Sequence, residues 1–202
     1  MYVDIRYYFG IGTHWKKELI KRREKVSMLH ELCIVDKYLE TAFMGAMNEF
    51  IDKRRDLIPP TFQPLTDKID SYQRYYRNLN SASSDELDSR PRAIVSKNTG
   101  AVVGFAAIRH YTDPNDSDRK RIGDVEIAIR PTQFNLGFEE DIVKVVFAEC
   151  LEMGLGKPIV TVNPNYTQLC EVLNSYPTEF EGEFEYAGVT YKRMVVVLNE
   201  EG

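Results

Sequence analysis

A strand-like run followed by a glycine loop and a helix is the part of the sequence best suited to chemistry. The run covers Gly123 to Ile129, the loop ends at Gly137, and a helix is predicted from about Glu139. Backbone N–H groups at the start of a helix lack partners within it and lie at the positive end of its dipole, so such a junction can hold a phosphate. Taken alone, one glycine before a helix is a weak predictor of anion binding.

The cysteines and histidines favour neither a metal site nor a disulfide framework. The three cysteines are widely spaced without a C-x-x-C pair, and the three histidines form no H-E-x-x-H motif. We therefore expect free thiols, no metal and a cytoplasmic protein. Neither a signal-peptide core nor an apolar run of bilayer length is visible, so no membrane partner is expected.

Charge divides the chain into two parts. Residues 1–27 hold seven basic and three acidic residues, a net charge of +4, whereas residues 28–202 carry −9 and the whole chain −5. We interpret residues 1–27 as a basic N-terminal extension and residues 28–202 as one domain. The acidic domain disfavours nucleic acid as a partner and would attract a cationic small molecule or peptide. Recruitment of nucleic acid or an acidic partner by the basic extension is the weakest of our hypotheses.

Hydrophobic periodicity over residues 28–202 predicts an α+β domain with a mixed, mainly antiparallel sheet flanked by helices. Helices end where proline or glycine interrupts the pattern, and hairpins are indicated by glycine turns. The strands are expected at 28–34, 93–95, 101–108, 125–129, 159–162, 180–186 and 189–198. The helices are expected at 37–55 with Asp36 as cap, 65–79, 139–153 and 166–174, and residues 113–121 are expected to form a loop.

The order of these elements, together with three motifs, resembles the GNAT superfamily of N-acetyltransferases, especially its bacterial predicted-acetyltransferase branch. The motifs are Ile108-Arg109-His110, the run Gly123 to Pro131 and Asn135-Leu136-Gly137-Phe138. The resemblance continues through residues 161–165 and the final hairpin. It implies the acyl-CoA N-acyltransferase fold, acetyl-CoA as co-substrate and direct acetyl transfer to an amine of a small molecule or peptide. A homodimer is compatible with it.

The resemblance also assigns cofactor-binding positions. The strand backbone at Ile127 and Ile129 would hold the thioester end of acetyl-CoA. Backbone amides of the loop would hold its pyrophosphate, from Phe134, Asn135, Leu136, Gly137, Phe138 and Glu139.

Two loop positions depart from the family pattern, so the loop is degenerate. Phe134 replaces an arginine or glutamine, which Gln133 could partly supply if the loop shifts by one residue, and Glu139 replaces a small residue. A carboxylate about 6 Å from a phosphate charge costs up to about 3 kcal/mol at an effective dielectric of about 20.

For the base that accepts the proton of the amine, the resemblance points to Glu126 first and His110 second. Strand alternation puts Glu126 on the same face as Ala128, where it could point into a cleft. A solvent-facing or hydrogen-bonded strand carboxylate is an equally good interpretation of Glu126, and a lone histidine is more often a structural hydrogen-bonding residue.

No general acid for the departing thiolate can be named. The family's tyrosine corresponds to Leu173, and Tyr166 lies two turns earlier. Together with Phe134 and Glu139, this motivates a second hypothesis, in which the domain has lost catalysis and serves as a binding or regulatory module.

Overall fold

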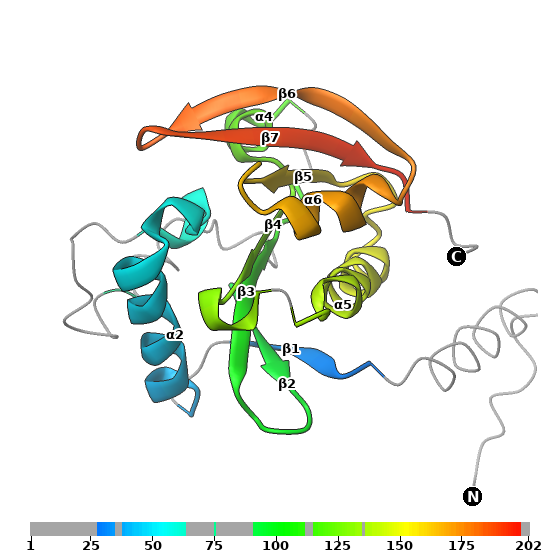
Figure 1. Cartoon of the computed structure of the whole chain (residues 1–202). Coiled ribbons are helices and arrows are strands. Elements are labelled where there is room, and N and C mark those ends of the chain that lie inside the picture. The colour runs from blue at the N-terminus through cyan, green and yellow to red at the C-terminus, as the bar shows by residue number, and fades with distance from the viewer. Residues whose placement is uncertain are drawn as a thin grey trace, which may run out of the picture.

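Seven strands form one mixed sheet in the order β1-β2-β3-β4-β5-β7-β6 (Figure 1). The computed structural model describes residues 28–34, 38–63, 75, 91–111, 115–134 and 136–198. The strands are β1 His30–Ile34, β2 Arg92–Ser96, β3 Val102–Ile108, β4 Val125–Ile129, β5 Ile159–Val162, β6 Thr178–Tyr186 and β7 Val189–Val196. Among the described strands, β4 and β5 form the only parallel pair. The predicted α+β class, with a mixed and mainly antiparallel sheet, is confirmed.

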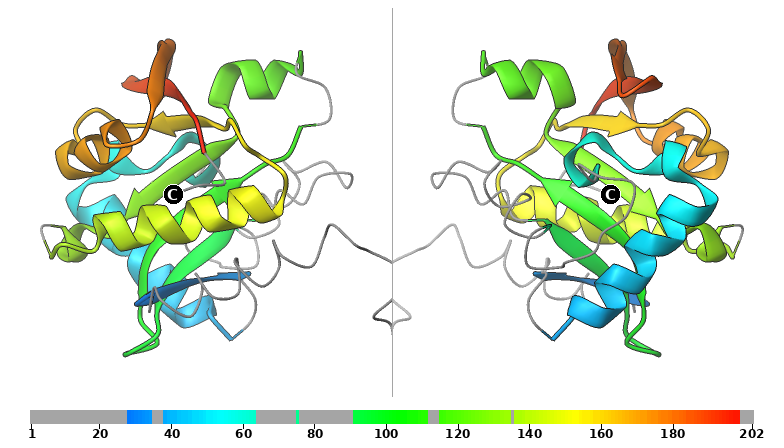
Figure 2. Two further views of the ribbon diagram at one scale, coloured as in Figure 1. Left: turned by 90° about the vertical axis from the view of Figure 1, so that its right-hand side faces the viewer. Right: turned by 90° about the vertical axis from the view of Figure 1, so that its left-hand side faces the viewer.

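Helices cover both faces of the sheet, with α2 on one face and α5 and α6 on the other (Figure 2). The α-helices are α2 Glu40–Lys53, α4 Ser117–Ile122, α5 Glu139–Glu152 and α6 Thr167–Asn174. The described residues also form three single turns of 3₁₀ helix, namely η1 Arg55–Leu57, η2 Pro60–Phe62 and η3 Pro131–Gln133. Within the described ranges, no helix is long and apolar enough to cross a membrane.

The core lies on both faces of the sheet, and one part of it is where α2 packs on the central strands. Phe43 and Phe50 of α2 place their rings 4.8 and 5.7 Å from the ring of Phe105 in β3. Every residue of β3 and β4 is buried, as expected for strands covered on both faces. Phe43, Ala46, Met47 and Phe50 of α2 are all buried.

Two parts of the predicted arrangement differ from the structure. Helix α2 begins at Glu40, after a turn at Tyr38 and Leu39, and has no side-chain cap. The expected loop over 113–121 contains helix α4, whose sequence SDRKRI has too little apolar periodicity to indicate a helix. Asp36, residues 1–27 and the predicted helix over 65–79 apart from Tyr75 lie outside the described residues.

The last hairpin ends the sheet with an acidic strand. Its turn uses two residues with positive φ, Ala187 at 51° and Gly188 at 77°, which matches the twist of a hairpin. Strand β6 pairs only with β7 among the described strands, so its other edge is open. Glutamates alternate along β6 at exposed positions, namely Glu179, Glu181, Glu183 and Glu185.

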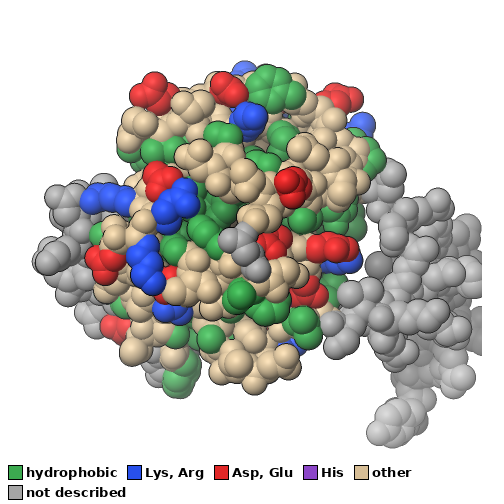
Figure 3. All heavy atoms as spheres, viewed as in Figure 1, with side chains coloured by type: hydrophobic (Ala, Val, Ile, Leu, Met, Phe, Trp, Pro, Cys, Tyr) green, Lys and Arg blue, Asp and Glu red, His purple; other side chains and the backbone are tan. Residues whose placement is uncertain are grey.

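Acidic and basic side chains are mixed on the face of the molecule shown in Figure 3, where they alternate with apolar and uncharged ones. The negative charge of residues 28–202 is therefore not gathered into one field on this face.

Candidate functional site

The sheet opens between its two parallel strands. Strands β4 and β5 pair at only two positions, Val125 with Val160 and Glu126 with Thr161. Beyond Glu126, β4 continues beside β3 alone, and beyond Thr161, β5 continues beside β7 alone. The two strands thus share a short seam that is closed at its beginning and open toward Ile129.

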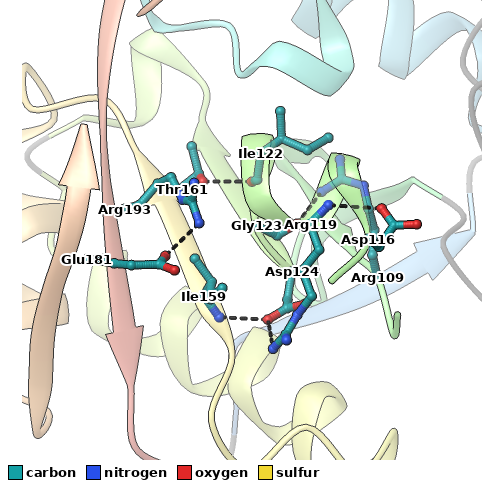
Figure 4. Close-up of polar contacts among 10 residues, drawn as sticks. All are labelled: Arg109, Asp116, Arg119, Ile122, Gly123, Asp124, Ile159, Thr161, Glu181 and Arg193. Carbon is teal, nitrogen blue, oxygen red and sulfur yellow. Dashed lines mark hydrogen bonds and ion pairs between the residues drawn. The ribbon is translucent and has the colours of Figure 1, made fainter. Parts of the chain in front are cut away.

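The closed end of the seam is tied by Asp124 (Figure 4). Its backbone N–H donates to the Ile159 carbonyl at 2.8 Å, and its carboxylate accepts the Ile159 N–H at 2.8 Å. The same carboxylate accepts a hydrogen bond from Arg119 Nε at 2.8 Å, on helix α4. Gly123 has a φ of +73°, and a Cβ there would lie 2.7 Å from the Ile159 carbonyl oxygen, so the chain needs glycine at this position.

The open end of the seam is filled by the phenol of Tyr166, the residue that precedes α6. Its hydroxyl donates to the Ile129 carbonyl at 2.7 Å and accepts the Ile129 N–H at 3.2 Å. The ring is buried and packs edge-on against Phe134, with centroids 5.0 Å apart. Burial raises the pKa of Tyr166 well above its ordinary value, so the hydroxyl keeps its proton and can donate.

Glu49 of α2 fixes the start of the loop between β4 and α5. Its carboxylate accepts hydrogen bonds from Arg130 Nε at 2.5 Å and from the Thr132 N–H at 2.7 Å. Burial would raise the pKa of Glu49, but the hydrogen bonds from Arg130 and Thr132 outweigh it and hold the pKa below its ordinary value. The loop leaves β4 in a defined direction as a result.

Helix α5 begins at the end of this loop without a side-chain cap. Of the three acids in its first turn, Glu140 pairs with Lys144 at 2.5 Å, and Asp141 accepts a hydrogen bond from His30 Nδ1 at 2.7 Å. Glu139 is 6% exposed and lies at the beginning of the helix. Backbone N–H groups here can bind an anion, and Glu139 is the side chain that opposes one.

Glu126, the first candidate base, is fully buried in an ion pair. Its carboxylate accepts hydrogen bonds from the Arg109 guanidinium, the Thr61 hydroxyl and the Thr61 N–H, the last at 3.2 Å. Arg109 is itself only 7% exposed. The carboxylate therefore has a structural role in this arrangement. An amine can contact it only if the side chain of Thr61 or Arg109 moves away.

The expected site residues divide between the two ends of β4. His110 is exposed and follows Arg109 just beyond the end of β3, beside the closed end of the seam. The cofactor-binding candidates lie along the open end and the loop beyond it: Ile127, Ile129, Phe134, Leu136, Gly137, Phe138 and Glu139. Leu136 is exposed, Gly137 has a φ of +78°, and Asn135 lies outside the described residues.

Sequence reasoning missed the partners that hold these residues. Thr61 is 65 residues from Glu126 and follows two prolines that indicated only a helix end. Glu49 appeared as one polar residue of an amphipathic helix. Arg109 stands in the Ile108-Arg109-His110 motif, which could have identified it as the partner of a strand carboxylate.

The similarity of this chain to known proteins is found in its three-dimensional structure and not in its sequence. No protein-family model matches the sequence, and no curated protein sequence matches it. A spermidine N-acetyltransferase from Vibrio cholerae, solved with CoA and spermine, is similar with a TM-score of 0.58 and 14% identity, over 84% of this chain and 96% of that one.

Two further solved structures are similar to this chain to the same degree. A GNAT superfamily phosphinothricin acetyltransferase from Sinorhizobium meliloti, in complex with AcCoA, gives a TM-score of 0.56 at 15% identity, over 86% of this chain and 90% of that one. A ribosomal-protein-alanine N-acetyltransferase from Brucella melitensis gives 0.57 at 13% identity, over 83% and 99%. The chain therefore has the fold of the GNAT acetyltransferases.

Proposed function

We propose that this protein is an acetyl-CoA-dependent N-acetyltransferase that transfers the acetyl group directly to an amine. The observation that carries the proposal is the seam between β4 and β5, which opens at the same end of β4 from which the loop leads to the uncapped start of α5. Solved structures with this fold include acetyltransferases in complex with CoA or AcCoA.

Backbone groups would bind the cofactor. Ile127 and Ile129 would offer peptide groups to its thioester arm, and the amides of Leu136 to Glu139 would face its pyrophosphate. The Phe134 N–H donates to the Pro131 carbonyl at 3.3 Å, so it joins them only if that bond breaks. Acetyl-CoA supplies an acetyl group activated as a thioester. The backbone donors do not depend on side-chain identity, so the loop retains them although Phe134 and Glu139 depart from the family pattern.

The acceptor is an amine of a small molecule or peptide. The relatives named for spermidine, phosphinothricin and a ribosomal-protein alanine span that range. The charge of −9 on residues 28–202 favours a cationic acceptor. Glu126 would accept the amine proton after Arg109 or Thr61 moves aside, whereas His110 is exposed without any such movement.

A second candidate function is a binding or regulatory module that has lost acetyl transfer. The closed ion pair of Glu126 with Arg109 favours it, because a base must be reachable by the proton it accepts. Burial of Glu139 at the start of α5 points the same way.

Calorimetric titration with acetyl-CoA separates these functions. The enzyme binds acetyl-CoA, and Glu139→Ala tightens binding, by up to about a hundredfold if the carboxylate stands about 6 Å from a phosphate. Glu140→Ala is the matched control, since the Glu140 carboxylate is exposed and pairs with Lys144, one turn further along α5. It should change affinity by less than about threefold.

The second measurement is thiol release in the presence of a polyamine, an amino acid or a peptide with a free N-terminus. Turnover with any of them supports the enzyme. Binding of acetyl-CoA without turnover supports the binding module. Absence of binding at millimolar acetyl-CoA refutes both acetyl-CoA as the cofactor and the acetyltransferase function.

A further inference from the structure

The Tyr166 hydroxyl is hydrogen-bonded to peptide groups of β4 that would otherwise be unpaired at the open end of the seam. At the end of β4, the N–H and C=O of Ile129 point away from β3 and have no partner strand, because pairing with β5 ends at Glu126. Buried backbone groups left without partners are costly. The Tyr166 phenol meets both of them, as acceptor of the N–H at 3.2 Å and donor to the C=O at 2.7 Å.

The geometry of this contact also defines the chemistry of what could replace the phenol. One residue offers a donor and an acceptor side by side, in extended backbone. Two successive secondary amides satisfy both, one through its C=O and the other through its N–H, as a neighbouring strand does. An ionised phosphate offers acceptors and so does not supply the donor that the Ile129 C=O needs.

The position of Tyr166 is built into the fold. The Tyr166 N–H donates to the Asn163 carbonyl at 3.0 Å, and the Asn163 side chain donates to the Asp56 carbonyl at 2.6 Å, which ties this turn to η1. Phe134 holds the other side of the ring. The phenol is thus aimed at Ile129 by contacts from three separate parts of the chain.

We infer that Tyr166 is a built-in competitor for the two pantetheine amides of acetyl-CoA, and so lowers the affinity of the site for its cofactor. This inference rests on the proposed function, because it takes the open seam as the place of the thioester arm. In the cofactor-free protein the hydroxyl is hydrogen-bonded to Ile129. Binding exchanges these two phenol hydrogen bonds for two to successive amides of pantetheine, one accepting from the Ile129 N–H and the other donating to its C=O. Affinity is reduced by the free energy of the bonds that must be broken.

Tyr166→Phe tests the inference, because it removes the hydroxyl and keeps the ring. Dissociation constants are measured by calorimetry for CoA, for pantetheine, and for adenosine 3′,5′-bisphosphate, which lacks the amides. The variant should bind CoA and pantetheine about tenfold more tightly, the equivalent of one typical hydrogen bond, and adenosine 3′,5′-bisphosphate unchanged. The matched control is Tyr191→Phe, which removes another buried phenol hydrogen bond, to the Ile58 carbonyl at 2.8 Å. It should leave all three constants unchanged.

Hydrogen exchange of the Ile129 amide gives a second readout. It should be faster in Tyr166→Phe than in the wild type, and CoA should slow it in both proteins. Equal or weaker binding of CoA by Tyr166→Phe overturns the inference while leaving the proposed function intact. Failure of both proteins to bind CoA at millimolar concentration refutes the proposed function and the inference with it.

Discussion

The buried pair of Glu126 and Arg109 makes the sharpest prediction for stability. Glu126→Gln keeps the shape of the side chain and an acceptor for the Thr61 N–H but removes the negative charge. Arg109, only 7% exposed, would then be a buried charge without its partner. Breaking a buried ion pair on one side costs about 3–5 kcal/mol. For a chain of this size, each kcal/mol lowers the melting temperature by about 2–4 °C, so the variant should melt about 6–20 °C below the wild type.

Urea denaturation followed by circular dichroism measures this effect, and a double-mutant cycle isolates the pair. Glu126→Gln combined with Arg109→Met should be less destabilised than the sum of the single variants, by at least about 2 kcal/mol. Glu140→Gln is the control, because its pair with Lys144 is exposed, and it should cost less than about 1 kcal/mol. If Glu126→Gln unfolds within about 1 kcal/mol of the wild type, or if the two changes are additive, the reasoning from burial is refuted.

Two further predictions concern the loop and the centre of the sheet. Glu49→Gln should lower the free energy of unfolding by about 2 kcal/mol at pH 7. The folded pKa of Glu49 lies below its unfolded value near 4.5, so the stabilisation is complete above that value and is lost as the pH falls through the folded pKa. Denaturation curves of variant and wild type should therefore converge as the pH is lowered, and a constant difference would contradict the assignment. Gly104→Ala should destabilise the fold by about 3 kcal/mol or more, because its Cβ would lie 2.3 Å from the Ala128 carbonyl oxygen. Gly45→Ala in α2 is the contrasting variant. Its Cβ would meet nothing within 4 Å, so it should stabilise the fold by about 0.5–1 kcal/mol. Melting temperatures check both, and equal effects of the two alanines would refute the steric argument.

Local pattern was enough to predict most of the fold. Strands β4 and β5 have the predicted bounds, 125–129 and 159–162, because each is short and rich in β-branched residues and has glycine, proline or asparagine within two residues of its ends. Helix α4 was missed because it is stabilised by contacts with distant residues, such as the hydrogen bond from the Arg193 guanidinium to the Lys120 carbonyl, and not by an apolar face.

The candidate site was harder to predict because its side chains are satisfied by distant residues. Alternation along β4 indicated which face Glu126 occupies, but its contact with Thr61 spans 65 residues and leaves no trace in local spacing. Tyr166 was considered only as a proton donor. Its actual contact with Ile129 depends on where β4 and β5 stop pairing, which is a property of the assembled sheet.

The acidic strand β6 has a consequence for how copies of this protein behave at high concentration. An open sheet edge is a template on which a second chain can add a strand, and this is a common route to aggregation. Two β6 edges brought together would place rows of glutamates near each other, and like charges across paired strands are destabilising. The four exposed glutamates of β6 therefore guard the sheet against edge-to-edge growth as long as they remain ionised.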